Sequence, residues 1–289
     1  MKVLISDPFA PSLPDRLKKF GEVTEDKSQL PEADIVLVRS KTKCDQEYID
    51  SAKKLKLIIR GGVGLDNIDL TYAKEKGIEV RNTPEASKVA VAELTCAHML
   101  AASCNIIEAH NSLIKGEWKK KELKRTELMG KTLGIIGIGR VGTEVAKRAH
   151  AFGMKIIAYD KYVKKSDFAE MKSLNELLSE ADYISFHVCL TEETEGILDK
   201  DMIAKMKDGV IIINTSRGKC VNEEHIAQAL KKGKIRKYAN DVWYSDPPDS
   251  DSPLLSAPHV QLSPHLGAST KENLLRISDI IIKIISEFK

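Results

Sequence analysis

Three glycines form the clearest chemical pattern in the chain. Gly137, Gly139 and Gly142 make up G-x-G-x-x-G, directly after an apolar run and at the start of a helical one. The missing side chains allow a tight turn and let a pyrophosphate approach the N–H groups at the helix N-terminus, near Arg140 and Val141. A glycine triplet alone is weak, because glycine turns are common. In this strand, turn and helix context it predicts a dinucleotide-binding site.

One carboxylate indicates which dinucleotide binds. Asp160 ends the next apolar run, roughly 20 residues after the first glycine, where an acid hydrogen-bonds the adenosine ribose. A carboxylate there repels a 2′-phosphate, so the sequence predicts NAD as the cofactor. Lys161, Lys164 and Lys165 follow it and leave NADP open as an alternative.

An arginine and a histidine can supply the groups that hydride transfer to a dinucleotide requires. Arg217 follows an apolar run, where its guanidinium can make paired bonds to a substrate carboxylate or carbonyl. An exposed ion pair is its alternative role. His265, in SPHLGAST, can exchange a hydroxyl proton near neutral pH. His187 ends another apolar run and can line the cofactor site.

A proline-rich loop, YSDPPDSDSPL at residues 244–254, precedes this histidine. Its prolines exclude both a helix and a central strand. Asp246 is either an ordinary turn carboxylate or the partner of His265, and we predict the second role. The other histidines are interpreted as packed, solvent-facing or loop residues: His98, His110, His150, His225 and His259.

Short apolar runs alternate with amphipathic stretches, which is typical of parallel βαβ construction. Strands are expected within residues 2–6, 34–40, 56–62, 77–82, 131–139, 154–160, 182–188, 209–216, 237–243 and 260–265. One long helix is expected over residues 87–116. The pattern predicts an α/β fold with two doubly wound parallel sheets, and the stretch 269–288 should pack on the first of them.

Composition narrows the class of protein. The length of 289 residues suits two domains, and 42% hydrophobic with 30% charged residues describes a globular chain. A net charge of +3 does not suggest a nucleic-acid partner, and no secretory signal or membrane span is recognised. The five scattered cysteines form no CxxC pair. They predict reduced thiols in a cytoplasmic protein without a metal site.

Six ordered stretches resemble motifs of the D-isomer-specific 2-hydroxyacid dehydrogenases, and most closely their 3-phosphoglycerate dehydrogenase branch. They are RGGVGLDNIDL, the glycine motif with its acid, ISFHVCLTEETEGIL, NTSRGKCVNEE, NDVWYSDPP and SPHLGASTKE. The resemblance covers essentially the whole chain. Six motifs in order are more specific than any one of them.

The resemblance implies a Rossmann NAD-binding domain over residues 85–266, inserted into a flavodoxin-like substrate domain over residues 1–84 and 267–289. It implies a site in the cleft, with His265 as acid/base, Asp246 orienting it, and Arg217 binding the substrate carboxylate and keto oxygen. Further cofactor contacts are implied at Thr215, Asp241 and Gly267, besides His187 and His265. A homodimer formed through the long-helix region is also implied, with Lys119 to Lys121 adding charge to a neighbouring subunit's site.

The chain departs from the family pattern at several positions. Asp246 stands where the family usually has glutamate, so its contact with the histidine should need a small loop shift or a water bridge. Arg125 replaces a common glycine, and Val63 replaces a hydroxyl residue, although the N–H groups of Gly62 and Val63 can still bind a carboxylate. Because the chain ends at Lys289, serine feedback through an appended domain is not expected.

Two arginines indicate the substrate. Arg39 and Arg60 both follow apolar runs and suit a phosphate, although each can equally form a structural ion pair. The resulting hypothesis is NAD-dependent oxidation of D-3-phosphoglycerate to 3-phosphohydroxypyruvate in serine biosynthesis. The alternatives are a dehydrogenase for an unphosphorylated D-2-hydroxyacid, such as glycerate, lactate or glyoxylate-derived glycolate, and a non-catalytic NADH-sensing protein.

Overall fold

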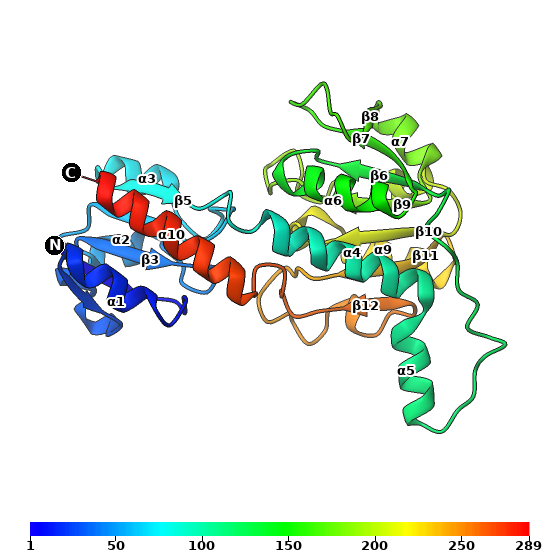
Figure 1. The fold of residues 1–289 in the computed structure, drawn as a ribbon, viewed down its shortest axis with the longest axis horizontal. Helices are drawn as coiled ribbons and strands as arrows, with labels where there is room; N and C mark the ends of the chain where they lie inside the picture. The colour runs from blue at the N-terminus through cyan, green and yellow to red at the C-terminus, as the bar shows by residue number, and fades with distance from the viewer. Residues whose placement is uncertain (289) are drawn as a thin grey trace. The chain divides into compact units, whose positions relative to one another are not determined.

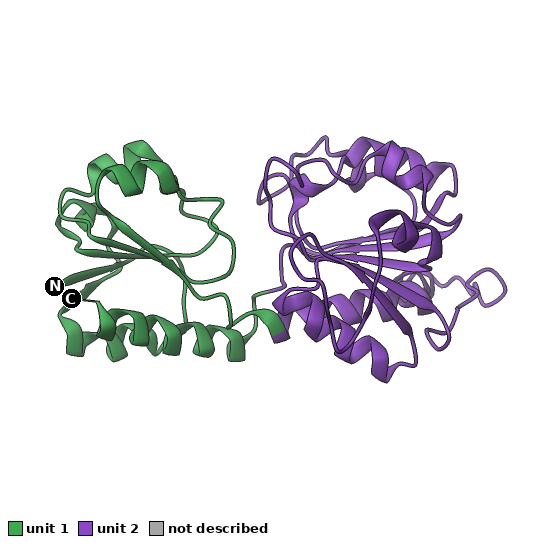
Figure 2. Cartoon of the chain, turned by 90° about the horizontal axis from the view of Figure 1, so that it is seen from above, with its two compact units in different colours: residues 1–88, 268–289 green, residues 89–267 purple. Residues whose placement is uncertain are grey.

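The computed structural model describes residues 1–288 and separates the chain into two compact units (Figure 2). Unit 1 comprises residues 1–88 and the segment from residue 268, and unit 2 comprises residues 89–267. Each unit contains one parallel sheet with its own apolar clusters. The predicted α/β fold with two doubly wound parallel sheets is therefore confirmed.

Unit 1 is built on a five-stranded sheet in the order β2-β1-β3-β4-β5, with all neighbouring strands parallel. This is the flavodoxin-like order. The strands are β1 (Lys2–Ile5), β2 (Glu22–Thr24), β3 (Ile35–Val38), β4 (Leu57–Arg60) and β5 (Glu79–Asn82). The helices are α1 (Leu13–Leu17), α2 (Gln46–Ser51), α3 (Leu70–Glu75) and α10 (Lys271–Glu287), with 3-10 turns η1 (Lys18–Phe20) and η2 (Lys27–Glu32).

The C-terminal helix α10 completes the core of unit 1. Thr270 caps its start by accepting a hydrogen bond from the N–H of Asn273. Ile277, Ile281 and Ile285 repeat every four residues and are buried in the cluster that contains β1, β3 and β4 side chains. Burying each isoleucine contributes about 1.5–3 kcal/mol relative to leaving it exposed. Apolar residues from both ends of the chain thus build one core.

Unit 2 is built on a seven-stranded parallel sheet in the order β12-β11-β10-β9-β6-β7-β8. The strands are β6 (Thr132–Ile136), β7 (Lys155–Tyr159), β8 (Glu170–Met171), β9 (Tyr183–Phe186), β10 (Val210–Asn214), β11 (Ile235–Asn240) and β12 (Val260–Leu262). The helices are α4 (Lys88–Cys104), α5 (Ile106–Ile114), α6 (Arg140–Ala151), α7 (Leu174–Glu180), α8 (Lys200–Ala204) and α9 (Glu223–Lys231), with η3 (Gly218–Cys220) and η4 (Pro253–Leu255). The strand order reverses between β6 and β9, and such switch points are where open α/β sheets bind ligands.

The prediction of a single helix over residues 87–116 is wrong. α4 ends at Cys104 and α5 begins at Ile106, because Asn105 between them has a φ of 53°, in the left-handed region. Asparagine tolerates this region better than most residues. The two helices are bent by 62° (Figure 1). Among the described residues, no single helix is long and apolar enough to cross a membrane, and only this bent pair meets that test together.

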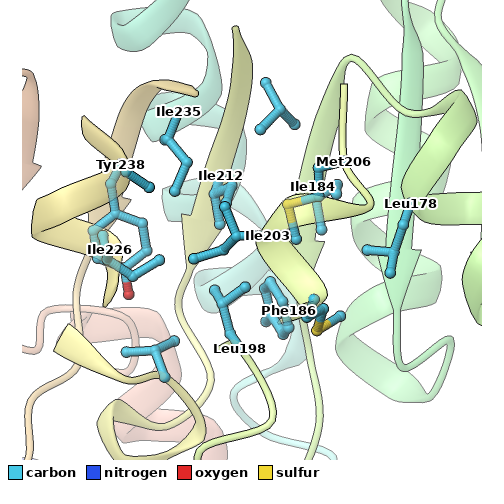
Figure 3. Packing of buried hydrophobic residues seen from close by; sticks show 14 of the residues in the cluster. Leu178, Ile184, Phe186, Leu198, Ile203, Met206, Ile212, Ile226, Ile235 and Tyr238 are labelled. Carbon is cyan, nitrogen blue, oxygen red and sulfur yellow. The ribbon is translucent and has the colours of Figure 1, made fainter. Parts of the chain in front are cut away.

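Side chains of the unit 2 strands alternate between two apolar clusters. Ile211 and Ile213 of β10 pack in one cluster and Ile212 packs in the other, as the two-residue period of a strand requires. Figure 3 shows part of the second cluster, to which β9 and β11 contribute Phe186 and Tyr238. This packing fixes the strand ends from which the site residues follow.

Candidate active site

The glycine-rich turn joins β6 to α6 at the switch point of the unit 2 sheet. Gly137 has a φ of 94°, and a Cβ there would lie 2.6 Å from the backbone oxygen of His187. A Cβ on Gly142 would lie 2.1 Å from the oxygen of Gly137, so this glycine allows close packing of the helix. Gly139 faces open space. These positions fit the needs of a dinucleotide site: a tight turn, close helix packing and room for a pyrophosphate.

The first turn of α6 is suited to an anion. Gly139 is its N-cap residue and provides no side-chain cap, so no capping side chain fills the space before the N–H groups of Arg140 and Val141. The N-terminal end of a helix also carries partial positive charge. The residues present therefore fit the pyrophosphate of a dinucleotide.

Asp160 follows β7 and organises the backbone around the glycine turn. Its Oδ2 accepts a hydrogen bond from the N–H of Ile138 at 3.0 Å. Its Oδ1 accepts from the N–H groups of Tyr162 and Val163 at 2.8 and 2.9 Å. Because each carboxylate oxygen has two lone pairs, Asp160 retains the capacity to accept from a ribose hydroxyl.

Two of the lysines after Asp160 are engaged by other groups. The Nζ of Lys161 donates to both carboxylate oxygens of Glu193, at 2.6 and 2.5 Å. The Nζ of Lys164 donates to the backbone oxygen of Lys161 at 2.6 Å. The carboxylate of Glu193 offsets the charge of Lys161, which a 2′-phosphate would need, and this favours NAD over NADP.

Substitution of Asp160 should separate its structural contacts from its charge. Asp160→Ala should weaken NAD binding about tenfold or more, because it removes the ribose acceptor and releases three backbone N–H groups. Asp160→Asn keeps an acceptor oxygen, so it should lose less NAD affinity while narrowing the preference for NAD over NADP. Fluorescence titration with both cofactors measures these effects, with Asp167→Asn, an exposed carboxylate of the same loop, as control. Unchanged NAD affinity in both Asp160 variants would contradict the predicted role.

His187 follows β9 and is held uncharged. Its backbone oxygen lies against the glycine turn, and its Nε2 is 2.8 Å from the Oγ of Ser185. Burial lowers the pKa of His187 to about 3, because the imidazolium would lose its hydration. A neutral ring is thus available beside the glycine turn at any physiological pH.

Acid should destabilise the protein through His187. The pKa of this histidine is 6.5 in the unfolded chain and about 3 in the folded one, so at intermediate pH only the unfolded state binds a proton. The contribution of His187 to the free energy of unfolding is complete above pH 6.5. Below that pH it declines, by about 2 kcal/mol near pH 5. Urea unfolding at neutral and acidic pH measures the decline, which should be smaller in His187→Gln. An equal decline in both proteins would contradict a depressed pKa.

Asp241 holds the turn that carries His265. It is 1% exposed, and its Oδ1 and Oδ2 accept from the N–H groups of Leu266 and Gly267, each at 2.8 Å. His265 has a φ of 54°, a conformation that a non-glycine residue keeps only when its surroundings hold it. Thr215, another predicted cofactor contact, follows β10 and shares a hydrogen bond of 2.8 Å with Thr95.

His265 and Asp246 are brought into direct contact. The Nδ1 of His265 lies 2.5 Å from the Oδ2 of Asp246, so the shorter carboxylate reaches the ring without a bridging water. Their side chains are 33% and 44% exposed, which leaves the pair accessible to a ligand. With Nδ1 directed to the carboxylate, Nε2 is the ring nitrogen suited to exchange a proton.

Arg217 ends a tight turn after β10. The Asn214 side chain accepts from the N–H and hydroxyl of Ser216 at 3.0 and 2.8 Å, and donates to the oxygen of Arg217 at 3.0 Å. The Nη1 of Arg217 donates to the oxygen of Ser216 at 2.7 Å. Gly218 follows, and a Cβ there would lie 2.1 Å from the carbonyl carbon of Trp243. The turn is therefore packed closely against the segment after β11.

Arg39 and Arg60 lie at one edge of the unit 1 sheet. Val38 pairs with Arg60 across β3 and β4, so both arginines stand at the carboxyl ends of neighbouring strands. Asp7 accepts from the N–H of Arg39 at 2.6 Å and fixes its backbone. The Nε of Arg39 is buried and makes no hydrogen bond within the described residues. Such a donor is costly unless a ligand or water supplies an acceptor.

The segment after Arg60 is shaped around its guanidinium. Gly62 has a φ of 152°, which favours glycine, and a Cβ there would lie 1.4 Å from Nη1 of Arg60 and displace the guanidinium. The N–H of Gly62 donates to the oxygen of Arg60 at 2.9 Å, and a bound carboxylate would compete with this bond. Asn82 donates to the backbone oxygen of Val63 at 2.6 Å and orients that peptide.

The sequence of the chain matches a known protein family and several characterised relatives. Residues 96–267 match the family described as D-isomer specific 2-hydroxyacid dehydrogenase, NAD binding domain. The chain belongs to the D-isomer-specific 2-hydroxyacid dehydrogenases. Hydroxypyruvate reductase of Thermotoga maritima is 49% identical over 89% of this chain and 86% of that protein. D-3-phosphoglycerate dehydrogenase of Methanocaldococcus jannaschii is 46% identical over 94% of this chain, which spans 54% of that relative.

Solved structures agree with this assignment. D-lactate dehydrogenase from Aquifex aeolicus, complexed with NAD and lactic acid, has a TM-score of 0.90 at 32% identity. The match covers 100% of this chain and 95% of that one. NAD-dependent formate dehydrogenase from Staphylococcus aureus, in complex with NAD, has a TM-score of 0.87 at 31% identity, with 100% of this chain and 95% of that one covered. The predictions of an NAD-dependent enzyme of this family and of NAD as cofactor are confirmed, which disfavours the non-catalytic alternative.

Several residues that hold the turns of this dehydrogenase were not predicted from its sequence. They are Asp7, Asn82, Asn214 and Ser263. Asp7 follows β1, and Asn82 and Asn214 end β5 and β10; a position at a strand end is a signal that could have found them. Ser263 directly follows β12 and carries the same signal.

Proposed function

We propose that the protein oxidises D-3-phosphoglycerate to 3-phosphohydroxypyruvate with NAD, as in serine biosynthesis. The observation that carries the choice of substrate is the pair Arg39 and Arg60, placed at the carboxyl ends of neighbouring strands of unit 1. A buried Nε without a hydrogen bond makes Arg39 a donor suited to a phosphate. Relatives named D-3-phosphoglycerate dehydrogenase support the same substrate. Unit 1 is then the substrate domain and unit 2 the NAD-binding domain.

The residues of unit 2 have complementary roles in this proposal. His265 takes the C2 hydroxyl proton at Nε2, and Asp246 holds the ring through Nδ1 and stabilises its charged form. Arg217 binds the substrate carboxylate with a planar guanidinium. Bound NAD would supply the acceptor for the hydride on C2. The backbone turn at Gly137, with Asp160, holds the cofactor.

A second substrate is favoured by one relative. The Thermotoga maritima protein is named hydroxypyruvate reductase, and the chain covers most of its length. Reduction of hydroxypyruvate and of 3-phosphohydroxypyruvate by NADH, compared as kcat/KM, distinguishes the two. A higher kcat/KM for the phosphorylated ketoacid supports the proposal, and a higher value for hydroxypyruvate overturns it.

Loss of either arginine should affect the phosphorylated substrate selectively. Arg39→Ala and Arg60→Ala should each raise the KM for 3-phosphoglycerate about 10- to 100-fold, because a charged hydrogen bond to phosphate is lost. The KM for unphosphorylated D-glycerate should change far less. Arg81→Ala is the matched control, since Arg81 in β5 pairs with Glu79. If both substrates are affected alike, these arginines are structural.

We further propose that the protein is a homodimer. α5 and the segment after it expose apolar side chains, with Ile106, Leu113, Ile114 and Trp118 at 56, 57, 72 and 78% exposure. Clustered exposure of this kind is typical of a surface that a partner covers. Lys119 pairs with Glu117 at 2.5 Å, which weakens its proposed contribution to a neighbour's site. Sedimentation equilibrium tests for the dimer. The cytoplasmic location of the protein stays a separate prediction.

A further inference from the structure

Four polar residues of unit 2, three of them buried and Ser263 half-buried, form a chain of hydrogen bonds that ends on the turn carrying His265. The chain consists of Gln261, His98, Ser263 and Asp241, in that order. His98 is 5% exposed, and Gln261 and Asp241 are 6% and 1% exposed. Buried polar groups are costly unless their partners are all in place. His98, which the sequence indicates only as a helix residue, links α4 to β12 and to the residue that follows it.

The contacts fix the position of each proton. The Nε2 of Gln261 lies 3.2 Å from the backbone oxygen of His98, which can only accept, so the amide nitrogen is the atom that faces His98. The same nitrogen lies 2.7 Å from Nδ1 of His98, which must therefore accept. The ring proton is then on Nε2, which donates to Oγ of Ser263 at 3.0 Å. The hydroxyl of Ser263 donates in turn to Oδ1 of Asp241 at 2.5 Å.

The neutral state of His98 is required by this direction of donation. Protonated His98 would present an N–H to the Gln261 amide, so two donors would face each other. Burial lowers the pKa of His98, and the Asp241 carboxylate opposes this effect to a smaller extent. The bond chain is therefore intact at neutral pH.

Asp241 links these hydrogen bonds to the backbone next to His265. Its two oxygens accept from the N–H groups of Leu266 and Gly267, the residues directly after the histidine. The hydroxyl of Ser263 donates a third hydrogen bond to the Asp241 carboxylate and helps to fix its rotation. If that hydroxyl is left without its donor at His98, it can rotate away, and the turn at His265 loses a constraint on its left-handed backbone.

We propose that His98 is a positioning residue for His265 and acts through Ser263 and Asp241. The inference rests on the proposed acid/base function of His265. His98→Leu fills the site without a donor, and Ser263→Ala removes the next member. His98→Gln keeps a side-chain N–H and Ser263→Thr keeps the hydroxyl, so these two variants should recover function. Ser103→Ala is the matched control, because it removes a buried α4 hydrogen bond to Tyr183 outside the chain of bonds.

The first measurement is turnover with the 2-hydroxyacid that the wild type oxidises fastest. His98→Leu and Ser263→Ala should each lower kcat about tenfold, with the KM for the hydroxyacid changed less than about threefold. The double variant should lose no more than either single one, because both break the same chain. Ser103→Ala should lower thermal stability without lowering kcat. Unchanged kcat in His98→Leu, or additive losses in the double variant, would overturn the proposal.

The second measurement does not depend on activity. Hydrogen exchange at the Leu266 and Gly267 amides should be about tenfold faster in His98→Leu and Ser263→Ala, because their acceptor is held less firmly. Exchange should return toward wild type in His98→Gln and Ser263→Thr, and stay unchanged in Ser103→Ala. If the wild type turns over none of the hydroxyacids, the proposed function fails while this exchange still decides whether His98 positions the turn. Equal exchange in all variants would overturn the positioning role.

Discussion

Replacement of His265 by alanine should lower kcat by about 10²–10⁴-fold, because it removes the group proposed to take the hydroxyl proton. The fold should stay close to wild type, since the side chain is partly exposed and contributes little packing, and any loss of NAD affinity should be small beside the loss of kcat. Steady-state oxidation of 3-phosphoglycerate measures the loss, and circular dichroism with NAD titration verifies the fold. A variant that retains more than about a tenth of the wild-type kcat would exclude His265 as the acid/base.

Two substitutions of Asp246 should have smaller effects than the loss of His265. Asp246→Asn keeps an oxygen that can accept from Nδ1 but removes the charge, so its loss should be smaller, about tenfold. Asp246→Glu restores the residue usual in the family and asks whether the direct 2.5 Å contact needs the shorter side chain. Wild-type kcat in Asp246→Asn would indicate that Asp246 is only a turn residue.

Substitution of Gly218 by alanine should destabilise the protein by about 3 kcal/mol or more, because a Cβ cannot be placed without moving backbone. That Cβ would lie 2.1 and 2.2 Å from the carbonyl carbon and oxygen of Trp243. The atoms it meets are main chain, so a rotamer change cannot relieve the clash. Urea unfolding measures the loss, and kcat should also fall because Arg217 directly precedes the displaced residue.

Gly139→Ala is the matched control for this prediction. No atom lies within 4 Å of a Cβ at Gly139, so the free energy of unfolding should be close to wild type. Its methyl group would occupy the space assigned to the pyrophosphate, and NAD affinity should fall instead. Two glycine-to-alanine changes would thus separate a packing role from a binding role. Comparable stability of Gly218→Ala and the wild type would contradict the close backbone packing.

The buried strands could be predicted because their residues leave few alternatives. A run such as Val210–Asn214, almost entirely apolar and β-branched, is stable only inside a covered parallel sheet. β2 and β8 were missed because they are edge strands of three and two residues, each containing a glutamate. The break at Asn105 was also missed, since apolar composition continues across it and a single backbone conformation decides it.

Some features of the candidate site could likewise be predicted from the sequence, and others could not. The glycine turn was predicted from spacing because Gly137 and Gly142 stand where a Cβ would clash with backbone, and Gly139 leaves the space that a pyrophosphate needs. The link between His98 and Ser263 joins residues 165 apart, and no local pattern encodes such a contact. The occupation of the Gly62 N–H by Arg60 likewise depends on a local turn that the sequence does not specify.

The division of unit 1 between the two ends of the chain sets the order in which the units can form on the ribosome. Residues 89–267 are continuous, so unit 2 can close its sheet as soon as β12 has emerged. The sheet of unit 1 is synthesised first, yet Ile277, Ile281 and Ile285 reach it only after all of unit 2 has been translated. Until then one face of the N-terminal sheet is covered only in part, by Leu13 and Leu17 of α1. Its exposed apolar side chains make the newly synthesised N-terminal segment a site for chaperone binding or aggregation.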